Sequence, residues 1–138
     1  MPRHSATVVL QTSSVQGDVE VYRHLGVDSS LTLRDLHRVL GLSFGLIDAP
    51  SPWGFTRAGR AISGDALVGD HLGAAGAELT YHWGLWQVRL HTIDAIDASE
   101  RDPRVPRARC VGGSGSFRHA PFDLHAINAA LASLPDRG

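Results

Sequence analysis

Several polar residues in and after the segment YHWGLWQVRLH, at positions 81–91, are of the types that bind metals or transfer protons. His82 and His91 lie near its two ends, and Asp94 follows. A zinc site needs about three converging protein ligands, and the sequence contains no H-x-H or H-x-x-x-H pair. We therefore expect these side chains on polar sheet faces, with no metal or other cofactor. A rebuilt His/Asp/Cys metal site or active site is the alternative.

Cys110, the only cysteine, raises the question of nucleophilic catalysis, with His91 or His119 as its base. No third group in a recognisable spacing would orient that base, and the G-x-S-x-G elbow of serine hydrolases is absent. The sequence also contains no lysine, which excludes a lysine Schiff base, a P-loop lysine and a Ser–Lys dyad. We expect an inert thiol, and we interpret the Gly-rich residues 112–116 as a connector rather than a phosphate loop.

The segment ERDPRVPRAR is the most informative charged stretch. It places Arg101, Arg104 and Arg107 three residues apart, with Arg109 nearby, and its prolines favour polyproline II, which has three residues per turn. Guanidinium groups along one edge would suit phosphates or carboxylates. The hypothesis is an anionic partner, either an acidic protein or a nucleic acid, and the alternative is a solvated loop.

Aromatic and helical residues supply a second set of candidate binding residues. Trp53 lies in the loop-like sequence PSPWGF, and we expect it to be the exposed tryptophan, whereas the alternation from Trp86 predicts that this residue faces the core. Arg34, His37 and Arg38 share the polar side of a predicted helix and complete the predicted partner-binding surface.

The composition limits the class of protein. The 138 residues suit one domain, the 43% hydrophobic content supports a core, and the net charge of −1 argues against a nucleic-acid binder driven by bulk charge. The N-terminal apolar run is too short for a signal peptide or a membrane span, so we expect a cytoplasmic protein with no membrane partner.

Periodicity predicts five strands and two main helices. The strands are expected at residues 6–11, 19–26, 55–63, 78–83 and 86–96, and the helices at residues 30–44 and 122–134. The first two strands should form a hairpin around a turn at residues 13–18, and residues 99–109 and 111–116 should be loops. Thr32 with Asp35 resembles a capping box, and Asp123 is a natural N-cap. The apolar helix stripes are Leu33, Leu36, Val39, Leu40 and Phe44, then Leu124, Ile127, Leu131 and Leu134. The order predicts a single α+β domain, residues 1–138, with a twisted, mostly antiparallel sheet and two main helices packed on it.

Four stretches carry a family resemblance. They are LTLRDLHRVLGLSFG at residues 31–45, residues 78–90, VPRARCVGG at residues 105–113 and PFDLHAINAAL at residues 121–131. In this order they resemble the plasmid pRiA open-reading-frame-three-like family, with its motifs L-x-x-L-H-x-x-I, Y-x-Y-D-F-G-D-x-W-x-H-x-I, Y-P-x-C-x-x-G and F-D-x-x-x-x-N-x-x-L. Members of this family are often labelled as passenger proteins of an insertion element. The resemblance implies an α+β fold with helices packed on a twisted sheet.

The chain departs from that family at its polar positions. The two aspartates of the family motif fall on His82 and Leu85, its histidine falls on Val88, and the acidic run after the cysteine is missing. The chain therefore resembles a degenerate member, of bacterial origin, and we expect a non-enzymatic binding or protein-interaction module. A nucleic-acid adaptor of a mobile element is the other alternative, suggested by the family label alone.

Overall fold

A single antiparallel sheet organises the protein. The computed structural model describes residues 5–16, 19–44, 52–84, 86–98, 108–115 and 123–132. The sheet has the strand order β4-β3-β5-β6-β1-β2-β7, and each neighbouring pair is antiparallel. The strands are β1 (Ser5–Gln16), β2 (Val19–Asp28), β3 (Trp53–Arg57), β4 (Arg60–Ile62), β5 (Glu78–Trp83), β6 (Trp86–Ala98) and β7 (Ala108–Ser114).

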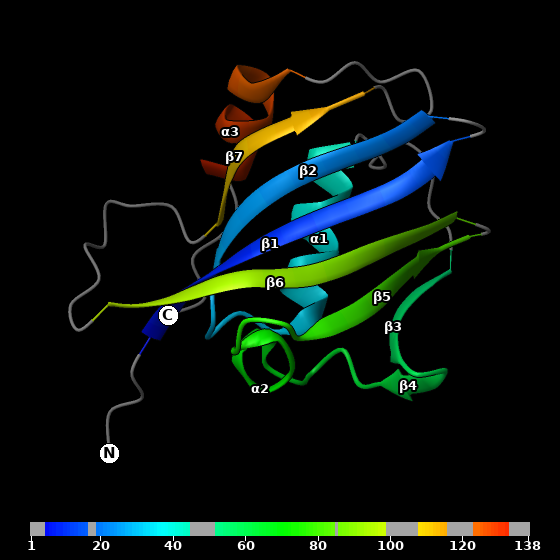
Figure 1. Ribbon diagram of the computed structural model, residues 1–138, viewed down its shortest axis with the longest axis vertical. Helices are drawn as coiled ribbons and strands as arrows, with labels where there is room; N and C mark the ends of the chain where they lie inside the picture. The colour runs from blue at the N-terminus through cyan, green and yellow to red at the C-terminus, as the bar shows by residue number, and fades with distance from the viewer. Residues whose placement is uncertain are drawn as a thin grey trace.

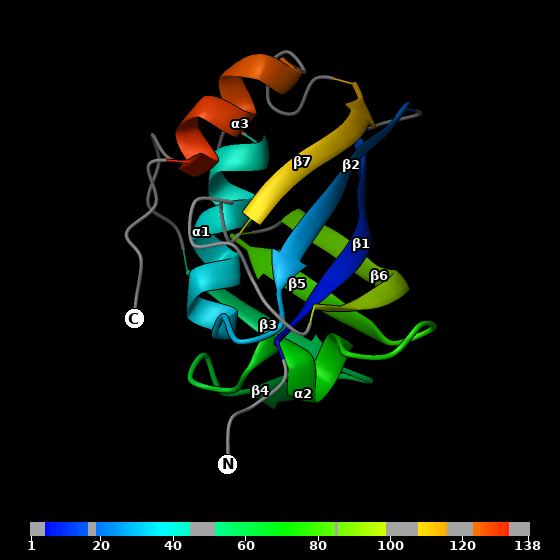
Figure 2. The ribbon, with the colours of Figure 1, turned by 90° about the vertical axis from the view of Figure 1, so that its left-hand side faces the viewer.

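The helices α1 (Leu33–Phe44) and α3 (Leu124–Ala132) lie on one face of this sheet, and the short α2 (Val68–Leu72) lies at one end (Figures 1 and 2). The other face, which we call the open face, is covered by none of the described helices (Figure 2). The predicted α+β class, with helices packed on an antiparallel sheet, is confirmed.

Two predicted strands have the wrong bounds, because backbone pairing and not the apolar pattern sets where a strand begins and ends. The hairpin of β1 and β2 is confirmed, but residues 13–16 continue β1, with Ser13 opposite Tyr22. Residues 55–63 form a hairpin of β3 and β4 rather than one strand. Ala58 and Gly59 have φ angles of 50° and 80°, the pattern of a type I′ turn, which tightly joins two twisted strands.

The predicted loops at residues 99–109 and 111–116 overlap a strand. Ala108–Ser114 forms β7, which pairs with β2. Sheet pairing uses backbone groups, so a Gly-rich segment can join an edge when neighbours hold it. On the helix side, Asn128 of α3 accepts a hydrogen bond from the Cys110 amide (2.7 Å) and donates one to the Cys110 carbonyl (2.8 Å). The side-chain amide of Asn128 thus pairs with the backbone N–H and C=O of Cys110, as a neighbouring strand would.

Two β-bulges interrupt the strand register, and each leaves an exposed aliphatic residue without an opposite partner. The register shifts leave Ile93 of β6 and Val111 of β7 without an opposite partner, and these side chains are 46% and 58% exposed. Before the first bulge, β6 alternates as predicted, with Val88 and Leu90 in the core. Trp86 is only partly buried against that core, so its predicted core position is only partly realised.

The helix α1 forms as its sequence predicts. Thr32 Oγ1 accepts a hydrogen bond from the Asp35 amide (3.1 Å), and the Asp35 carboxylate accepts one from the Thr32 amide (3.2 Å), which is the predicted capping box. All five residues of its apolar stripe are fully buried. In α3, Asp123 caps the Ala126 amide (3.0 Å) as predicted, but Leu124 is 40% exposed and is not part of the buried stripe. Phe122 and Leu134 lie outside the described residues.

A buried arginine joins α1 to the sheet. Arg23 of β2 is 1% exposed and faces α1. Its Nε donates to the Ser43 carbonyl in the last turn of α1 (2.9 Å), and its Nη atoms donate to the carbonyls of Ser114 and Gly115 (both 3.0 Å) and of Tyr22 (2.9 Å). Its guanidinium carbon also lies 5.2 Å from the centre of the Phe44 ring. The carbonyls at a helix C-terminus lack intrahelical donors and carry partial negative charge, so they stabilise a buried cation.

Replacing Arg23 should therefore destabilise the fold. We expect Arg23→Met to lower the free energy of unfolding by about 3 kcal/mol or more, because several buried carbonyls lose a charged donor. Urea unfolding followed by circular dichroism measures this change. The matched control is Arg89→Met at an exposed position of β6, where we expect a change within about 0.5 kcal/mol. Equal losses in the two variants would contradict the role of Arg23.

Candidate functional site

Trp53 does not project from a loop. It opens β3, pairs in register with Trp83 of β5, and is partly buried against the core. Its indole stacks on the His37 imidazole of α1, with ring centroids 4.0 Å apart and planes 7° apart. The prediction of an exposed loop tryptophan is therefore wrong, because sheet pairing places the ring against α1. The structure does bring Trp53 and His37, both predicted partner-binding residues, into contact.

The orientation of His37 is set by a buried tyrosine. Tyr81 of β5 is fully buried, and its hydroxyl lies 2.7 Å from His37 Nδ1. Burial raises the pKa of the Tyr81 phenol, so the phenol keeps its proton and donates it to Nδ1. We infer from this bond that His37 carries its own proton on Nε2. Burial, and then the nearby Arg38 charge, lower the pKa of His37, which favours this neutral form.

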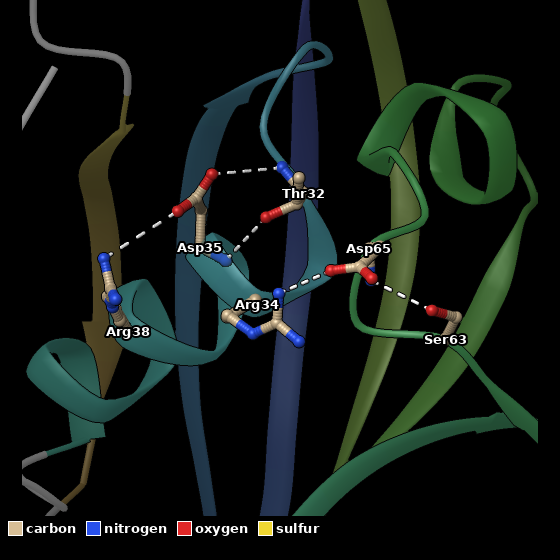
Figure 3. A network of polar contacts seen from close by, with 6 residues as sticks. All are labelled: Thr32, Arg34, Asp35, Arg38, Ser63 and Asp65. Atoms are coloured by element: carbon tan, nitrogen blue, oxygen red, sulfur yellow. Dashed lines mark hydrogen bonds and ion pairs between the residues drawn. The ribbon is translucent and has the colours of Figure 1, made fainter. Parts of the chain in front are cut away.

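An exposed ion pair joins α1 to the segment that precedes α2 (Figure 3). Arg34 Nη1 of α1 lies 2.5 Å from Asp65 Oδ1, and the two side chains are 45% and 77% exposed. Arg38 lies one helical turn further along, with its Nη1 4.0 Å from Asp35 Oδ1. Figure 3 shows Arg34 at the first turn of α1 and Arg38 at the next turn, with Asp65 approaching from the segment that precedes α2.

Arg34 and Trp53 both lie close to Gly64. A Cβ atom added to Gly64 would lie 3.3 Å from Trp53 Cη2 and 3.5 Å from Arg34 Nη2. The edge of the indole and the guanidinium therefore both lie beside this glycine. We call the set Arg34, His37, Arg38 and Trp53 the Trp53 platform.

The histidines of the predicted alternative site do not converge. His82 Nε2 lies 2.8 Å from Thr56 Oγ1, and His91 Nδ1 lies 3.4 Å from Glu78 Oε1, both on the open face. The strand register separates His82 from His91 by four residues along adjacent strands, roughly 13 Å. Asp94 lies beyond the bulge and accepts a hydrogen bond from the next amide, that of Ala95 (2.8 Å).

Cys110 lies far from these histidines. It is in β7, four strands from β5, which corresponds to roughly 19 Å, and its side chain faces the helices. The thiol is buried and donates to the Gly112 carbonyl (3.2 Å). Burial raises the pKa of this thiol. Within the described part of the chain, no group of three or more His, Cys, Asp or Glu side chains is arranged to hold a metal ion.

The predicted arginine loop is largely outside the described residues, which include none of Arg101, Arg104 and Arg107. Arg109 belongs to β7, is exposed, and alternates with the core-facing Ala108 and Cys110. It therefore projects on the open face, away from the Trp53 platform. The structure unites Arg34, His37, Arg38 and Trp53, and it separates Arg109 from them.

Sequence reasoning missed two residues that shape this site, and a third that holds the sheet edge. Tyr81 and Asp65 contact platform residues from segments 44 and 31 residues away along the chain, and no local pattern marks either pairing. Asn128 stood in a recognised motif, but its role at the sheet edge became visible only in the fold. The motif positions Cys110 and Asn128 are thus hydrogen-bonded to each other.

Comparison with known proteins identifies the fold alone. No family model matches the chain, and no curated protein matches it. The chain is similar to a solved structure from Methanosarcina mazei Go1, the protein of unknown function MM3350, with a TM-score of 0.66 and 16% sequence identity. The similarity covers 94% of this chain and 81% of that one. Membership of the plasmid pRiA family stays a prediction from the motifs. No helix in the described residues has the length and apolar character to span a membrane.

The lowered pKa of His37 predicts a pH dependence of stability. Above the ordinary value of 6.5 both folded and unfolded states are neutral at this residue, whereas below it the unfolded chain takes up the proton first. Stability should therefore fall as the pH drops from about 7 to about 5. We expect His37→Asn, which keeps an acceptor for Tyr81, to lose less stability than the wild type over this range. Urea unfolding at each pH tests this, and parallel curves for the two proteins would refute it.

The burial of Cys110 predicts an unreactive thiol. We expect Ellman's reagent to modify the native protein slowly and the urea-unfolded protein at once, because the thiolate is the reacting form. The positive control is Ala129→Cys in a Cys110→Ala background, which places a thiol on the exposed side of α3. Native Cys110 that reacted as fast as this surface cysteine would show that the site opens readily.

Proposed function

We propose that this protein is a non-enzymatic binding module that contacts a protein partner through the Trp53 platform. The observation that carries the proposal is the stack of Trp53 on His37, flanked by the exposed Arg34 and Arg38. Tryptophan, tyrosine and arginine are the residues most enriched among those that dominate binding energy at protein interfaces. A surface patch that joins an indole edge to two guanidinium groups has that composition.

The platform is also held in place before any partner arrives. The indole is stacked, His37 is hydrogen-bonded to a buried tyrosine, and α1 is capped and packed on the sheet. Side chains that are already ordered lose little conformational entropy on binding, which favours affinity. The separation of His82, His91 and Cys110 supports binding over catalysis, because general acid–base and nucleophilic mechanisms require such groups within hydrogen-bond reach.

We include in this proposal that the protein is bacterial and acts in the cytoplasm. The family resemblance supports a bacterial protein associated with a mobile element, and the single cysteine suits the reducing cytoplasm. A nucleic-acid adaptor would draw on the arginine loop at residues 101–107, and the net charge of −1 supplies no general attraction to phosphates. We therefore favour a protein partner over a nucleic acid.

Site-specific photo-crosslinking tests the proposal. A photoreactive benzoyl-phenylalanine at position 38, on the platform, should capture a defined partner in cells of the source organism. The matched control carries the same group at position 89, on the open face. Capture from position 89 but not from position 38 would move the interface to the open face and refute the proposal.

The identified partner then allows a quantitative measurement. We expect Arg34→Ala with Arg38→Ala to weaken binding at least about fivefold, because arginines at the centre of an interface commonly contribute more than about 1 kcal/mol each. Both side chains are substantially exposed, so the melting temperature should change little. An affinity unchanged in the double variant would contradict the role of the platform.

A further inference from the structure

We propose that the Trp53 platform takes an acidic peptide segment, and that Asp65 occupies the position of a ligand carboxylate in the free protein. This inference rests on the proposed function and specifies the chemistry of its partner. Asp65 would act as an internal competitor, which the partner's carboxylate displaces from Arg34. Two features support this inference: the arrangement of hydrogen-bond donors on α1, and the small stabilisation expected from the exposed Arg34–Asp65 ion pair.

Three hydrogen-bond donors share one face of α1. Arg34, His37 and Arg38 occupy positions i, i+3 and i+4, which are neighbours on a helix surface. Because Tyr81 occupies Nδ1, His37 offers an N–H at Nε2. Nε2 has no hydrogen-bond partner among the described residues, and it is not fully buried. It is therefore available to a ligand oxygen between the two guanidinium groups.

The platform already binds a carboxylate. Arg34 Nη1 and Asp65 Oδ1 are 2.5 Å apart, so the guanidinium is oriented for this chemistry (Figure 3). The pair is highly exposed, and exposed ion pairs contribute only about 0.2–1 kcal/mol. A ligand carboxylate that also reaches His37 and Trp53 would exceed that contribution and replace Asp65.

Displacing Asp65 requires movement of one side chain only. The segment that carries it is held against α1 by backbone bonds, from the Leu33 amide to the Ala66 carbonyl and from the Arg34 amide to the Gly64 carbonyl (both 2.9 Å). The Asp65 amide is itself bonded to Ser63 Oγ (3.1 Å). These contacts keep Gly64 beneath the indole edge while the carboxylate turns toward solvent.

The neighbouring charges favour a carboxylate ligand over a polyphosphate. Asp35 remains in the capping box, only 13% exposed, beside Arg38, and Asp65 stays nearby after it is displaced. These two carboxylates offset the two arginine charges, so the platform suits a ligand with a few separated carboxylates better than the continuous charge of a nucleic-acid backbone. A peptide in which acidic side chains alternate with aromatic ones can place one carboxylate on the donors and an apolar group against Trp53.

Calorimetric titration with a defined probe tests the inference. The probe is an acetylated peptide that repeats Glu-Glu-Trp-Glu, and its counterpart has glutamine at each glutamate. We expect the glutamate peptide alone to bind, and Asp65→Asn to bind it up to about fivefold more tightly, which corresponds to the release of one exposed ion pair. Arg34→Ala should weaken binding, whereas Arg89→Ala on the open face should not change it. Raising the ionic strength to about 0.5 M should weaken all of these affinities.

Several results would overturn the inference. An Asp65→Asn affinity equal to that of the wild type, with Arg34→Ala still weaker, would refute the competitor role of Asp65. Equal binding of the glutamine peptide would refute carboxylate recognition, and tighter binding of a single-stranded oligonucleotide would favour a nucleic-acid ligand. Any of these results could accompany successful crosslinking from position 38, so failure of this inference is distinguishable from failure of the proposed function.

Discussion

The position of α1 depends on the buried guanidinium of Arg23. It donates to a carbonyl at the C-terminal end of α1, to one in β2 and to two at the end of β7, so one side chain joins all three segments. Partial negative charge on these carbonyls offsets the cost of burying the cation. Because burial lowers the pKa of Arg23 only from a very high ordinary value, its charge persists. The helix that carries the candidate site is thus attached at one end by electrostatics and along its length by its apolar stripe.

At its other end, α1 is held by the segment that supplies Asp65. Carbonyls of Gly64 and Ala66 accept hydrogen bonds from the first-turn amides, which would otherwise lack partners. The same arrangement places an exposed carboxylate beside Arg34 and a glycine beneath Trp53. Structural and functional roles therefore share the same few residues. A change in this segment affects both the cap of the helix and the surface that we assign to binding.

The residues that carry the family resemblance include structural residues as well as one residue of the Trp53 platform. The motif residues Cys110 and Asn128 join an edge strand to α3, which is a structural role. His82 and Val88, at positions where the motif has an aspartate and a histidine, lie on β5 and β6. The Trp53 platform lies on the helix side of the molecule instead, around His37, a position within the first motif. The proposed binding surface thus does not depend on the strand positions that depart from the motif, because binding residues need only a rigid support.

Sequence patterns predict α1, its capping box, its buried stripe and most of the strands, because these features depend on interactions between residues at most four positions apart or on simple alternation. They also indicate Arg34, His37, Arg38 and Trp53 as candidate binding residues. Four features are visible only in the fold: Trp53 stacks on His37, Tyr81 orients this imidazole, the Gly-rich segment pairs as β7, and Arg23 is buried. These features join segments as many as 92 residues apart, and their partners are backbone carbonyls and rings that leave no periodic mark in the sequence.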